Sequence, residues 1–158
     1  MCIGMMLHGG VVAAMGTFFV FSDYMKPAVR IAALMQVPVK FIWTHDAFRV
    51  GEDGPTHEPV EQEAQIRLME KLKNHAGKDS VRVFRPADAD ETTVCWKLAM
   101  ENVETPTALI FSRQGIAKLP EGNDYEQAAK GAYIVAGSDE NPDVILVCLL
   151  YTSPSPRD

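Results

Sequence analysis

Two histidines and three carboxylates share one 15-residue loop between Thr44 and Glu58: they are His45, Asp46, Glu52, Asp53 and His57. A loop of this length inside a compact domain is typical of a functional element. Histidines and carboxylates can ligate a metal, but the spacing here matches no short helical metal motif. A histidine can transfer protons near neutral pH. Histidine and aspartate can also bind a polyhydroxylated substrate. A histidine that only faces solvent is the plainer alternative.

Four aromatic residues come close together in the segment TFFVFSDY: Phe18, Phe19, Phe21 and Tyr24. We expect a strand from Gly16 to Phe21. Alternation along such a strand places Phe19 and Phe21 on one face, and Phe18 with Val20 on the other. The pattern favours rings packed in a core. The alternative is a stacking pocket for a flat heterocycle, which needs several rings converging at a strand end.

Arg113 follows an apolar segment and is flanked by Ser112 and Gln114. The planar guanidinium fork is suited to a phosphate or a carboxylate. The same residue could also be a partner in a surface ion pair.

The apolar pattern predicts the elements that position these side chains. It indicates a helix that stops at Gly9-Gly10, three further helices at 22–36, 59–76 and 89–102, and strands at 16–21, 37–43, 81–84 and 107–111. Ser22 and Asp88 are the expected N-caps, the latter in a capping box with Glu91. A further strand is expected to start within 142–147. The alternation predicts an α/β fold, a parallel sheet with crossover helices on both faces. In such sheets ligands bind at the carboxyl ends of the strands, where both the histidine loop and Arg113 are expected.

Composition narrows the class of protein. Hydrophobic residues make up 47% and charged residues 23%, which is ordinary for a globular domain. The net charge of −6 argues against a nucleic-acid or anionic membrane surface. The three cysteines form no CxxC pair, which is typical of a reducing compartment. With neither a signal peptide nor a membrane span in the sequence, we expect a cytoplasmic protein.

Taken together, the motifs resemble the transketolase family over residues 1 to 147. The resemblance is collinear and is carried by Leu7-His8-Gly9-Gly10, Gly16-Thr17-Phe18, Phe21-Ser22-Asp23-Tyr24, Trp43-Thr44-His45-Asp46, Gly51-Glu52-Asp53-Gly54-Pro55-Thr56-His57, Arg85-Pro86-Ala87-Asp88 and the segment from Pro106 to Gln114. The resemblance implies the thiamine diphosphate-binding fold, and within it the domain that binds the pyrimidine ring.

The resemblance also implies roles for the cofactor-binding residues. Residues at the positions of Phe18, Phe21 and Tyr24 line the pocket for the aminopyrimidine of thiamine diphosphate. His57 matches the family's proton-handling histidine, near the cofactor and the substrate carbonyl. This implication replaces the core interpretation for Phe18 and Phe21.

The substrates implied by the resemblance are sugar phosphates. The position of Asp53 binds a substrate hydroxyl, and those of His45 and Arg113 bind the phosphate end. The implied reaction transfers a two-carbon ketol unit from a ketose phosphate to an aldose phosphate, in the pentose phosphate pathway. The cofactor carries the difficult step, and the protein positions groups and moves protons.

Parts of the family pattern are expected to be missing. The glutamate that activates the pyrimidine precedes the segment matching Leu7 to Gly10, and the diphosphate and Mg²⁺ site belongs to a preceding domain. We therefore expect a fragment that is inactive by itself. Residues 1–136 would be an N-terminally truncated pyrimidine-binding domain, 137–147 a linker and the start of a C-terminal domain, and 148–158 a non-native tail.

Two alternatives remain open. One is the pyrimidine domain of another thiamine diphosphate enzyme, such as deoxyxylulose-phosphate synthase or a keto-acid dehydrogenase β subunit. The other is a non-catalytic module for cofactor binding or dimerisation. The resemblance to transketolase implies a homodimer with the active site between the subunits, and neither a nucleic-acid nor a membrane partner.

Overall fold

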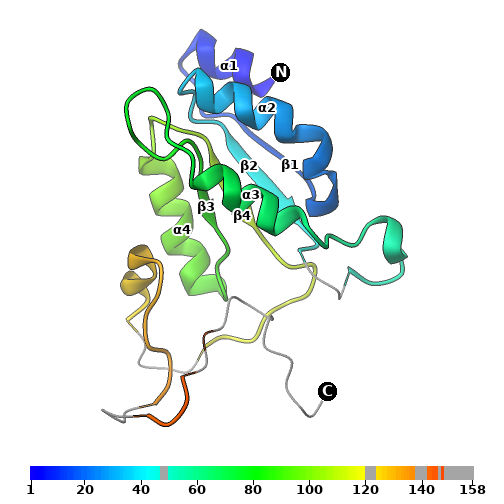
Figure 1. The fold of residues 1–158 in the computed structure, drawn as a ribbon, viewed down its shortest axis with the longest axis vertical. Coiled ribbons are helices and arrows are strands. Elements are labelled where there is room, and N and C mark those ends of the chain that lie inside the picture. The colour runs from blue at the N-terminus through cyan, green and yellow to red at the C-terminus, as the bar shows by residue number, and fades with distance from the viewer. Residues whose placement is uncertain (47–49, 120–123, 138–141, 146, 148–158) are drawn as a thin grey trace.

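The structure is a computed structural model of the 158-residue chain, and it describes residues 1–46, 50–119, 124–137, 142–145 and 147. Its helices are α1 (Cys2–His8), α2 (Ser22–Leu34), α3 (Gln62–Glu70) and α4 (Ala89–Glu101), and its strands are β1 (Ala14–Phe18), β2 (Lys40–Thr44), β3 (Arg82–Phe84) and β4 (Thr107–Ile110). Short 3₁₀ turns lie at Phe19–Phe21, Gly54–Thr56 and Tyr125–Lys130. Figure 1 shows their arrangement.

The four strands form one parallel sheet in the order β1-β2-β4-β3. Because all strands run the same way, their carboxyl ends lie along one edge, from which the histidine loop and the chain after β4 both leave (Figure 1). Between β2 and β3 the chain skips one position in the sheet, and β4 later occupies that position between the two strands. The expected α/β fold with a parallel sheet is confirmed.

Helices cover both faces of the sheet because alternate residues of each strand point to opposite sides. On one face, Phe41 and Trp43 of β2 pack with Val29 of α2 and Ile66 of α3. On the other face, Leu109 of β4 packs against Cys95 and Ala99 of α4, with Phe84 and Trp96 beside them. The two apolar layers hold the strand ends in fixed register, which is the frame for any site at that edge.

Several boundaries differ from the expected ones. β1 ends at Phe18, so the predicted strand to Phe21 is wrong for its last three residues. α3 begins at Gln62 and ends at Glu70, so the predicted helix 59–76 is too long at both ends. The described residues of 142–147 contain no strand, which contradicts the strand expected there. The tail at 148–158 lies outside the described residues.

Of the two predicted helix caps, Asp88 at α4 is confirmed and Ser22 at α2 is wrong. The side chain of Asp88 accepts a hydrogen bond from the backbone N–H of Glu91 at 2.9 Å, and the Glu91 carboxylate accepts from the backbone N–H of Ala87 at 2.6 Å. This is the expected capping box of α4, except that the Glu91 carboxylate accepts from the backbone N–H of Ala87 and not from that of the N-cap residue Asp88. Ser22 instead is the first residue inside α2, with Phe21 as its N-cap. The Ser22 hydroxyl is buried and has no hydrogen-bond partner among the described residues.

Candidate functional site

The aromatic rings after β1 are arranged by the 3₁₀ turn rather than by strand alternation. Phe19 turns into the core, where it is 1% exposed and lies 5.6 Å from the ring centroid of Trp43. Phe18 and Phe21 are thereby brought to the same side, with ring centroids 6.2 Å apart and an interplanar angle of 21°. Tyr24, in the first turn of α2, is 81% exposed, and its ring centroid lies 6.1 Å from that of Phe21. The expected pairing of Phe19 with Phe21 is therefore wrong.

His45 is the first residue after β2, and it stacks on this ring pair. Its imidazole lies 3.7 Å from the ring of Phe18, centroid to centroid, at an interplanar angle of 16°. The hydroxyl of Thr44 lies 2.9 Å from His45 Nδ1. The backbone of His45 has φ +60°, in the left-handed region that residues other than glycine adopt uncommonly, with asparagine, aspartate and histidine the most frequent among them. The chain thus turns sharply at the strand end and places the imidazole flat on Phe18.

His57 reaches the same rings from the other end of the loop. It follows the 3₁₀ turn Gly54–Thr56, and its Nδ1 lies 2.8 Å from the hydroxyl of Thr56. Its ring stands edge-on to Phe21 at 5.3 Å and 80°, and to Phe18 at 6.0 Å and 71°. The two histidines, 12 positions apart in sequence, therefore converge on one aromatic cluster, made up of Phe18, Phe21, Tyr24, His45 and His57.

Arg113 approaches the loop at a different point. Gly51 has φ +97°, and a Cβ added there would lie 2.9 Å from Nη1 of Arg113 and 3.1 Å from its Cζ. The guanidinium therefore packs directly over the backbone of Gly51, and a Cβ at this position would force the guanidinium to shift. Asp53 is exposed at the start of the 3₁₀ turn, where its carbonyl accepts a hydrogen bond from the Thr56 hydroxyl at 3.2 Å. Asp53 within the loop and Arg113 beside it therefore lie outside the aromatic cluster.

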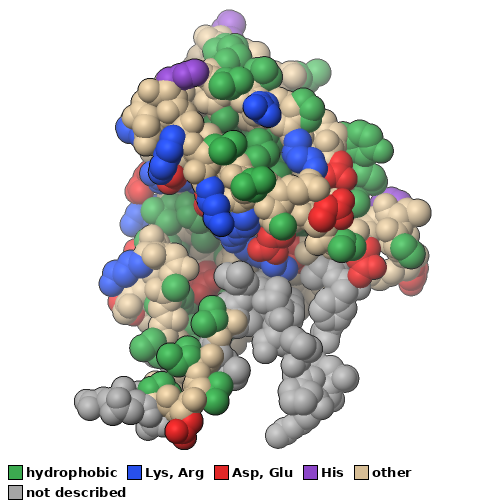
Figure 2. All heavy atoms as spheres, in the orientation of Figure 1, with side chains coloured by type: hydrophobic (Ala, Val, Ile, Leu, Met, Phe, Trp, Pro, Cys, Tyr) green, Lys and Arg blue, Asp and Glu red, His purple; other side chains and the backbone are tan. Residues whose placement is uncertain are grey.

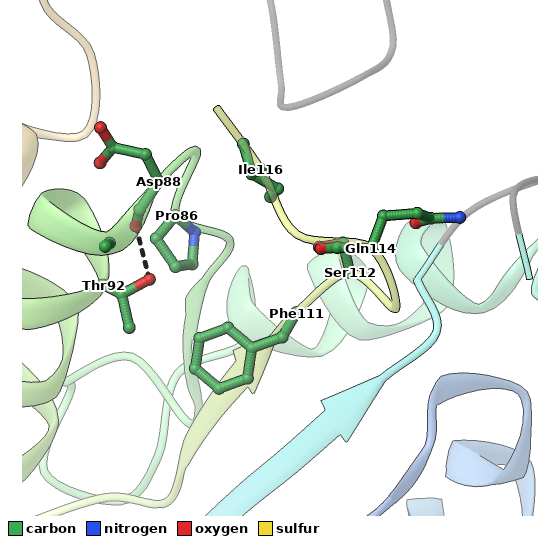
Figure 3. A pocket seen from close by; sticks show the side chains of 8 residues that line it. Pro86, Asp88, Thr92, Phe111, Ser112, Gln114 and Ile116 are labelled. Carbon is green, nitrogen blue, oxygen red and sulfur yellow. Dashed lines mark hydrogen bonds between the residues drawn. The ribbon is translucent and has the colours of Figure 1, made fainter. Parts of the chain in front are cut away.

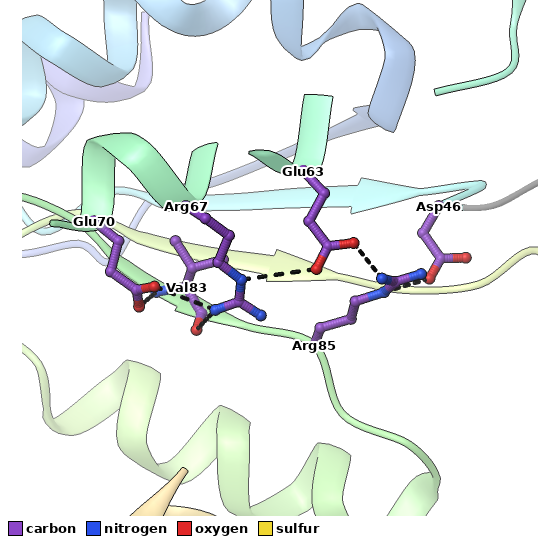
Figure 4. A network of polar contacts seen from close by, with 6 residues as sticks. All are labelled: Asp46, Glu63, Arg67, Glu70, Val83 and Arg85. Atoms are coloured by element: carbon purple, nitrogen blue, oxygen red, sulfur yellow. Dashed lines mark hydrogen bonds and ion pairs between the residues drawn. The ribbon is translucent and has the colours of Figure 1, made fainter. Parts of the chain in front are cut away.

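The sequence did not predict a buried network of ion pairs that joins Arg85 to Asp46 and Glu63. Arg85, the first residue after β3, donates from Nε to Asp46 at 3.0 Å and also pairs with Glu63 of α3 (Figure 4). The side chains of Arg85 and Asp46 are 3% and 1% exposed. The position of Arg85 directly after a strand was the available signal, since parallel strands end at one edge. That signal is weak, because Arg-Pro is equally typical of an ordinary strand end.

Two hollows lie outside the aromatic cluster. A small one of about 200 Å³ lies between the start of α4, with Pro86, Asp88 and Thr92, and the chain after β4, with Phe111 and Ser112 (Figure 3). A larger one of about 650 Å³ lies between α2 and α3, lined by apolar side chains together with two lysines and one arginine; Figure 2 shows apolar and basic side chains together on this face. Neither is lined by His45 or His57.

The described part of the chain contains no group of three or more His, Cys, Asp and Glu side chains arranged to hold a metal ion. No helix within it is long and apolar enough to cross a membrane.

Known proteins match both the sequence and the fold. The transketolase of Halalkalibacterium halodurans is 49% identical over 146 residues, which is 91% of this chain and 21% of that protein. The solved transketolase of Leishmania mexicana superposes with a TM-score of 0.75 at 37% identity, over 88% of this chain and 19% of that one. The transketolase of Pichia stipitis in complex with sedoheptulose 7-phosphate gives 0.68 at 39% identity, over 80% and 17%.

The match is therefore to one part of a longer protein, because the chain spans about a fifth of the length of these curated relatives. The part is identified by a family model, that of the transketolase pyrimidine binding domain, which matches residues 1–118 and includes the whole sheet and the aromatic cluster. On that match and those identities, this chain belongs to the pyrimidine-binding domain family of the transketolases.

Proposed function

We propose that this chain forms the pyrimidine-binding half of a transketolase active site. The parent enzyme would transfer a two-carbon ketol unit from a ketose phosphate to an aldose phosphate. One observation carries the proposal: two histidines from opposite ends of one loop meet on a pair of half-buried phenylalanine rings at the carboxyl edge of the sheet. Rings that can stack on a cofactor and an imidazole that can transfer protons are two of the contributions that this reaction would need from this domain.

The ring cluster fits the aminopyrimidine of thiamine diphosphate. Phe18 and Phe21 are nearly parallel and only partly buried, and Tyr24 beside them is exposed, so flat apolar surface remains for another ring. Rings at this spacing favour an offset-stacked aromatic partner. When bound, thiamine diphosphate supplies the carbanion chemistry by which the ketol unit is carried. Phe18, Phe21 and Tyr24 would hold its pyrimidine in place.

His57 is proposed to move protons. The Thr56 hydroxyl at Nδ1 and the edge contact with Phe21 fix the orientation of its imidazole. Its Nε2 has no hydrogen-bond partner among the described residues, and it is the ring atom proposed to exchange a proton with a substrate oxygen. An imidazole held in one orientation can act as a general acid and a general base.

Three residues are proposed to bind the substrate. His45 and Arg113 would bind the phosphate end, since an imidazole and a guanidinium both donate hydrogen bonds to phosphate oxygens. Exposed Asp53 would accept a hydrogen bond from a sugar hydroxyl. Arg113 packs on Gly51 of the same loop, so phosphate binding and the position of the loop would be coupled.

The domain is proposed to extend beyond the matched region, to residue 136. Backbone N–H of Leu119 donates to Asp88 at 3.0 Å, and the Tyr133 hydroxyl donates to Glu91 at 2.6 Å. Burial, followed by the hydrogen bond to Glu91, raises the pKa of Tyr133, so the phenol stays a donor at neutral pH. These contacts fasten Leu119 and the segment 124–137 to the start of α4. The linker would then be 137–147, with 148–158 outside the domain.

Other features of the proposal rest on the family alone. The diphosphate and Mg²⁺ would be bound by another domain of the parent protein. The parent would be a cytoplasmic homodimer of the pentose phosphate pathway, with its active sites between subunits.

A chimera tests the proposal. In it, residues 1–118 replace the matching segment of the Halalkalibacterium halodurans transketolase. The chimera should bind thiamine diphosphate and transfer ketol units. His57→Ala in the chimera should lower kcat by about 100-fold or more, with cofactor affinity nearly unchanged.

The control is His75→Ala, because His75 is exposed in the turn after α3 and outside the cluster. Its kcat should equal that of the chimera. A chimera that folds and binds the cofactor but transfers nothing would refute the function. Full turnover by His57→Ala would refute the role of His57.

A further inference from the structure

We infer that Arg85 is a positioning residue: with Asp46 it holds the turn that aims His45 at the phosphate of the substrate. The claim that Arg85 holds the His45 turn concerns the fold alone. The claim that His45 is thereby aimed at a substrate phosphate rests on the proposed function. Arg85 lies on β3's carboxyl end, and His45 lies on that of β2, with β4 between them.

The ion pair is closed off from water. Arg85 donates from Nε to Asp46 Oδ2 at 3.0 Å, and its Nη1 pairs with Glu63. With the Arg85 and Asp46 side chains almost fully buried, each charge depends on the other, because an unpaired buried ion costs several kcal/mol. The second oxygen of Asp46, Oδ1, is buried and has no hydrogen-bond partner among the described residues. Arg85 is therefore the main compensation for this carboxylate in the described part of the chain.

The pair acts on a strained point of the backbone. His45 is held at φ +60°, a left-handed conformation that is disfavoured because its Cβ crowds the following carbonyl oxygen. Such a conformation persists when its surroundings fix it. Asp46 is the next residue, so anchoring its carboxylate fixes the peptide that leaves His45. Without the anchor the turn can relax to negative φ, which would swing the imidazole off Phe18.

At position 85 a positive charge alone is not sufficient, because the planar guanidinium of arginine is needed. Its fork directs Nε at Asp46 on the loop and Nη1 at Glu63 on α3 at the same time (Figure 4). A lysine offers a single point charge on a flexible stem and cannot fix both directions. Arg85→Lys therefore keeps the charge and loses the geometry, which makes it the informative substitution.

A purely structural tether is the competing explanation, and the chain offers a matched control. Arg67 of α3 also joins the helix to the sheet, with Nη1 donating to the carbonyl of Val83 at 3.2 Å and to Glu70 at 3.2 Å. Its Nε also lies 3.7 Å from Glu63, the second partner of Arg85, but it makes no described contact with Asp46 (Figure 4). Arg67→Lys should therefore disturb the packing of α3 on β3 but leave the His45 turn in place.

The first test is NMR of the 158-residue chain, and it does not depend on the proposed function. The imidazole protons of His45, assigned with His45→Gln, should be shifted upfield by the face of Phe18 at 3.7 Å. Arg85→Lys should abolish this shift, and Arg67→Lys should retain it. Asp46→Asn, which keeps the size of the side chain, should repeat the effect of Arg85→Lys if the latter folds poorly. An unchanged shift in Arg85→Lys and Asp46→Asn would overturn the inference.

The second test uses the chimera with an aldopentose 5-phosphate and with the same aldopentose lacking its phosphate. Arg85→Lys should raise KM for the phosphorylated sugar about tenfold, the equivalent of one charge-assisted hydrogen bond. KM of Arg85→Lys for the unphosphorylated sugar should differ from that of the unsubstituted chimera by less than about twofold. Equal losses for both sugars would overturn the phosphate role. If the unsubstituted chimera transfers nothing, the proposed function fails, while the NMR result still decides whether Arg85 positions His45.

Discussion

Lys40 is a buried charge on the face of β2 that α4 covers, and its replacement by methionine should stabilise the protein at neutral pH. The residue is 2% exposed, and its Nζ donates to the carbonyl of Asn102, just after α4, at 2.8 Å. Burial, and then repulsion from Arg82, lowers the pKa of Lys40 to about 8. Methionine retains an unbranched apolar side chain and removes the charge.

The magnitude follows from the pKa. The drop from 10.5 to about 8 is 2.5 units, which at 1.36 kcal/mol per unit is a penalty of about 3 kcal/mol for keeping the amine charged in the folded state. Between pH 8 and 10.5 the unfolded chain holds the proton and the folded chain does not, so stability rises with pH. Below pH 8 the penalty is constant. Loss of the hydrogen bond to Asn102 offsets about 1 kcal/mol of the gain.

Lys40→Met should therefore be about 2 kcal/mol more stable than the unsubstituted chain at pH 7, and about 1 kcal/mol less stable at pH 10.5. Urea unfolding followed by the fluorescence of buried Trp43 measures both values. Lys97→Met is the control, because the Lys97 side chain is 61% exposed on α4, and it should change stability by less than about 0.5 kcal/mol at either pH. A difference between Lys40→Met and the unsubstituted chain that does not change with pH would refute the reasoning.

Two further predictions concern the loop and the end of α4. Gly51→Ala in the chimera should raise KM for phosphorylated sugars, because the new Cβ would lie 2.9 Å from Arg113 Nη1; Gly77→Ala, equally left-handed at φ +73° but with open space around it, should leave KM unchanged. Equal KM values for the two variants would contradict a role for Arg113. Asn102→Ala should destabilise the chain by about 2–4 kcal/mol in urea unfolding, because the buried amide donates to the Thr105 carbonyl and the Thr107 hydroxyl at 2.8 Å; a loss below about 1 kcal/mol would contradict that account.

The sequence predicted the elements better than their ends. The order of helices and strands follows from apolar periodicity, which is why the parallel sheet was foreseen. Pro59 suggested a helix start, yet α3 begins at Gln62. There the Gln62 side chain accepts from the backbone N–H of Val60 and donates to Asp23 of α2. Such a contact between distant segments cannot be found in a local pattern.

Phe18, Phe21, Tyr24, His45 and His57, the candidates from the sequence, lie together in the structure, but the geometry of their cluster could not be predicted. The family resemblance selected Phe18 and Phe21, while strand alternation paired Phe21 with Phe19. The 3₁₀ turn decides between them, because it rotates Phe19 into the core after the strand has ended. Arg85 was missed for a different reason. Its partner Asp46 lies 39 positions away, and only the strand order β2-β4-β3 brings the two ends near one another.

The strand order also determines how long β3 lacks its pairing partner during synthesis on the ribosome. In the described structure, β3 pairs only with β4, which begins 23 positions after β3 ends. At 5–20 residues per second, the nascent chain carries β3 without a neighbour for roughly one to five seconds. During that interval the edge of β2 that awaits β4 is open as well, and open edges invite pairing with other chains. The nascent domain is therefore most exposed to aggregation just before its last strand emerges.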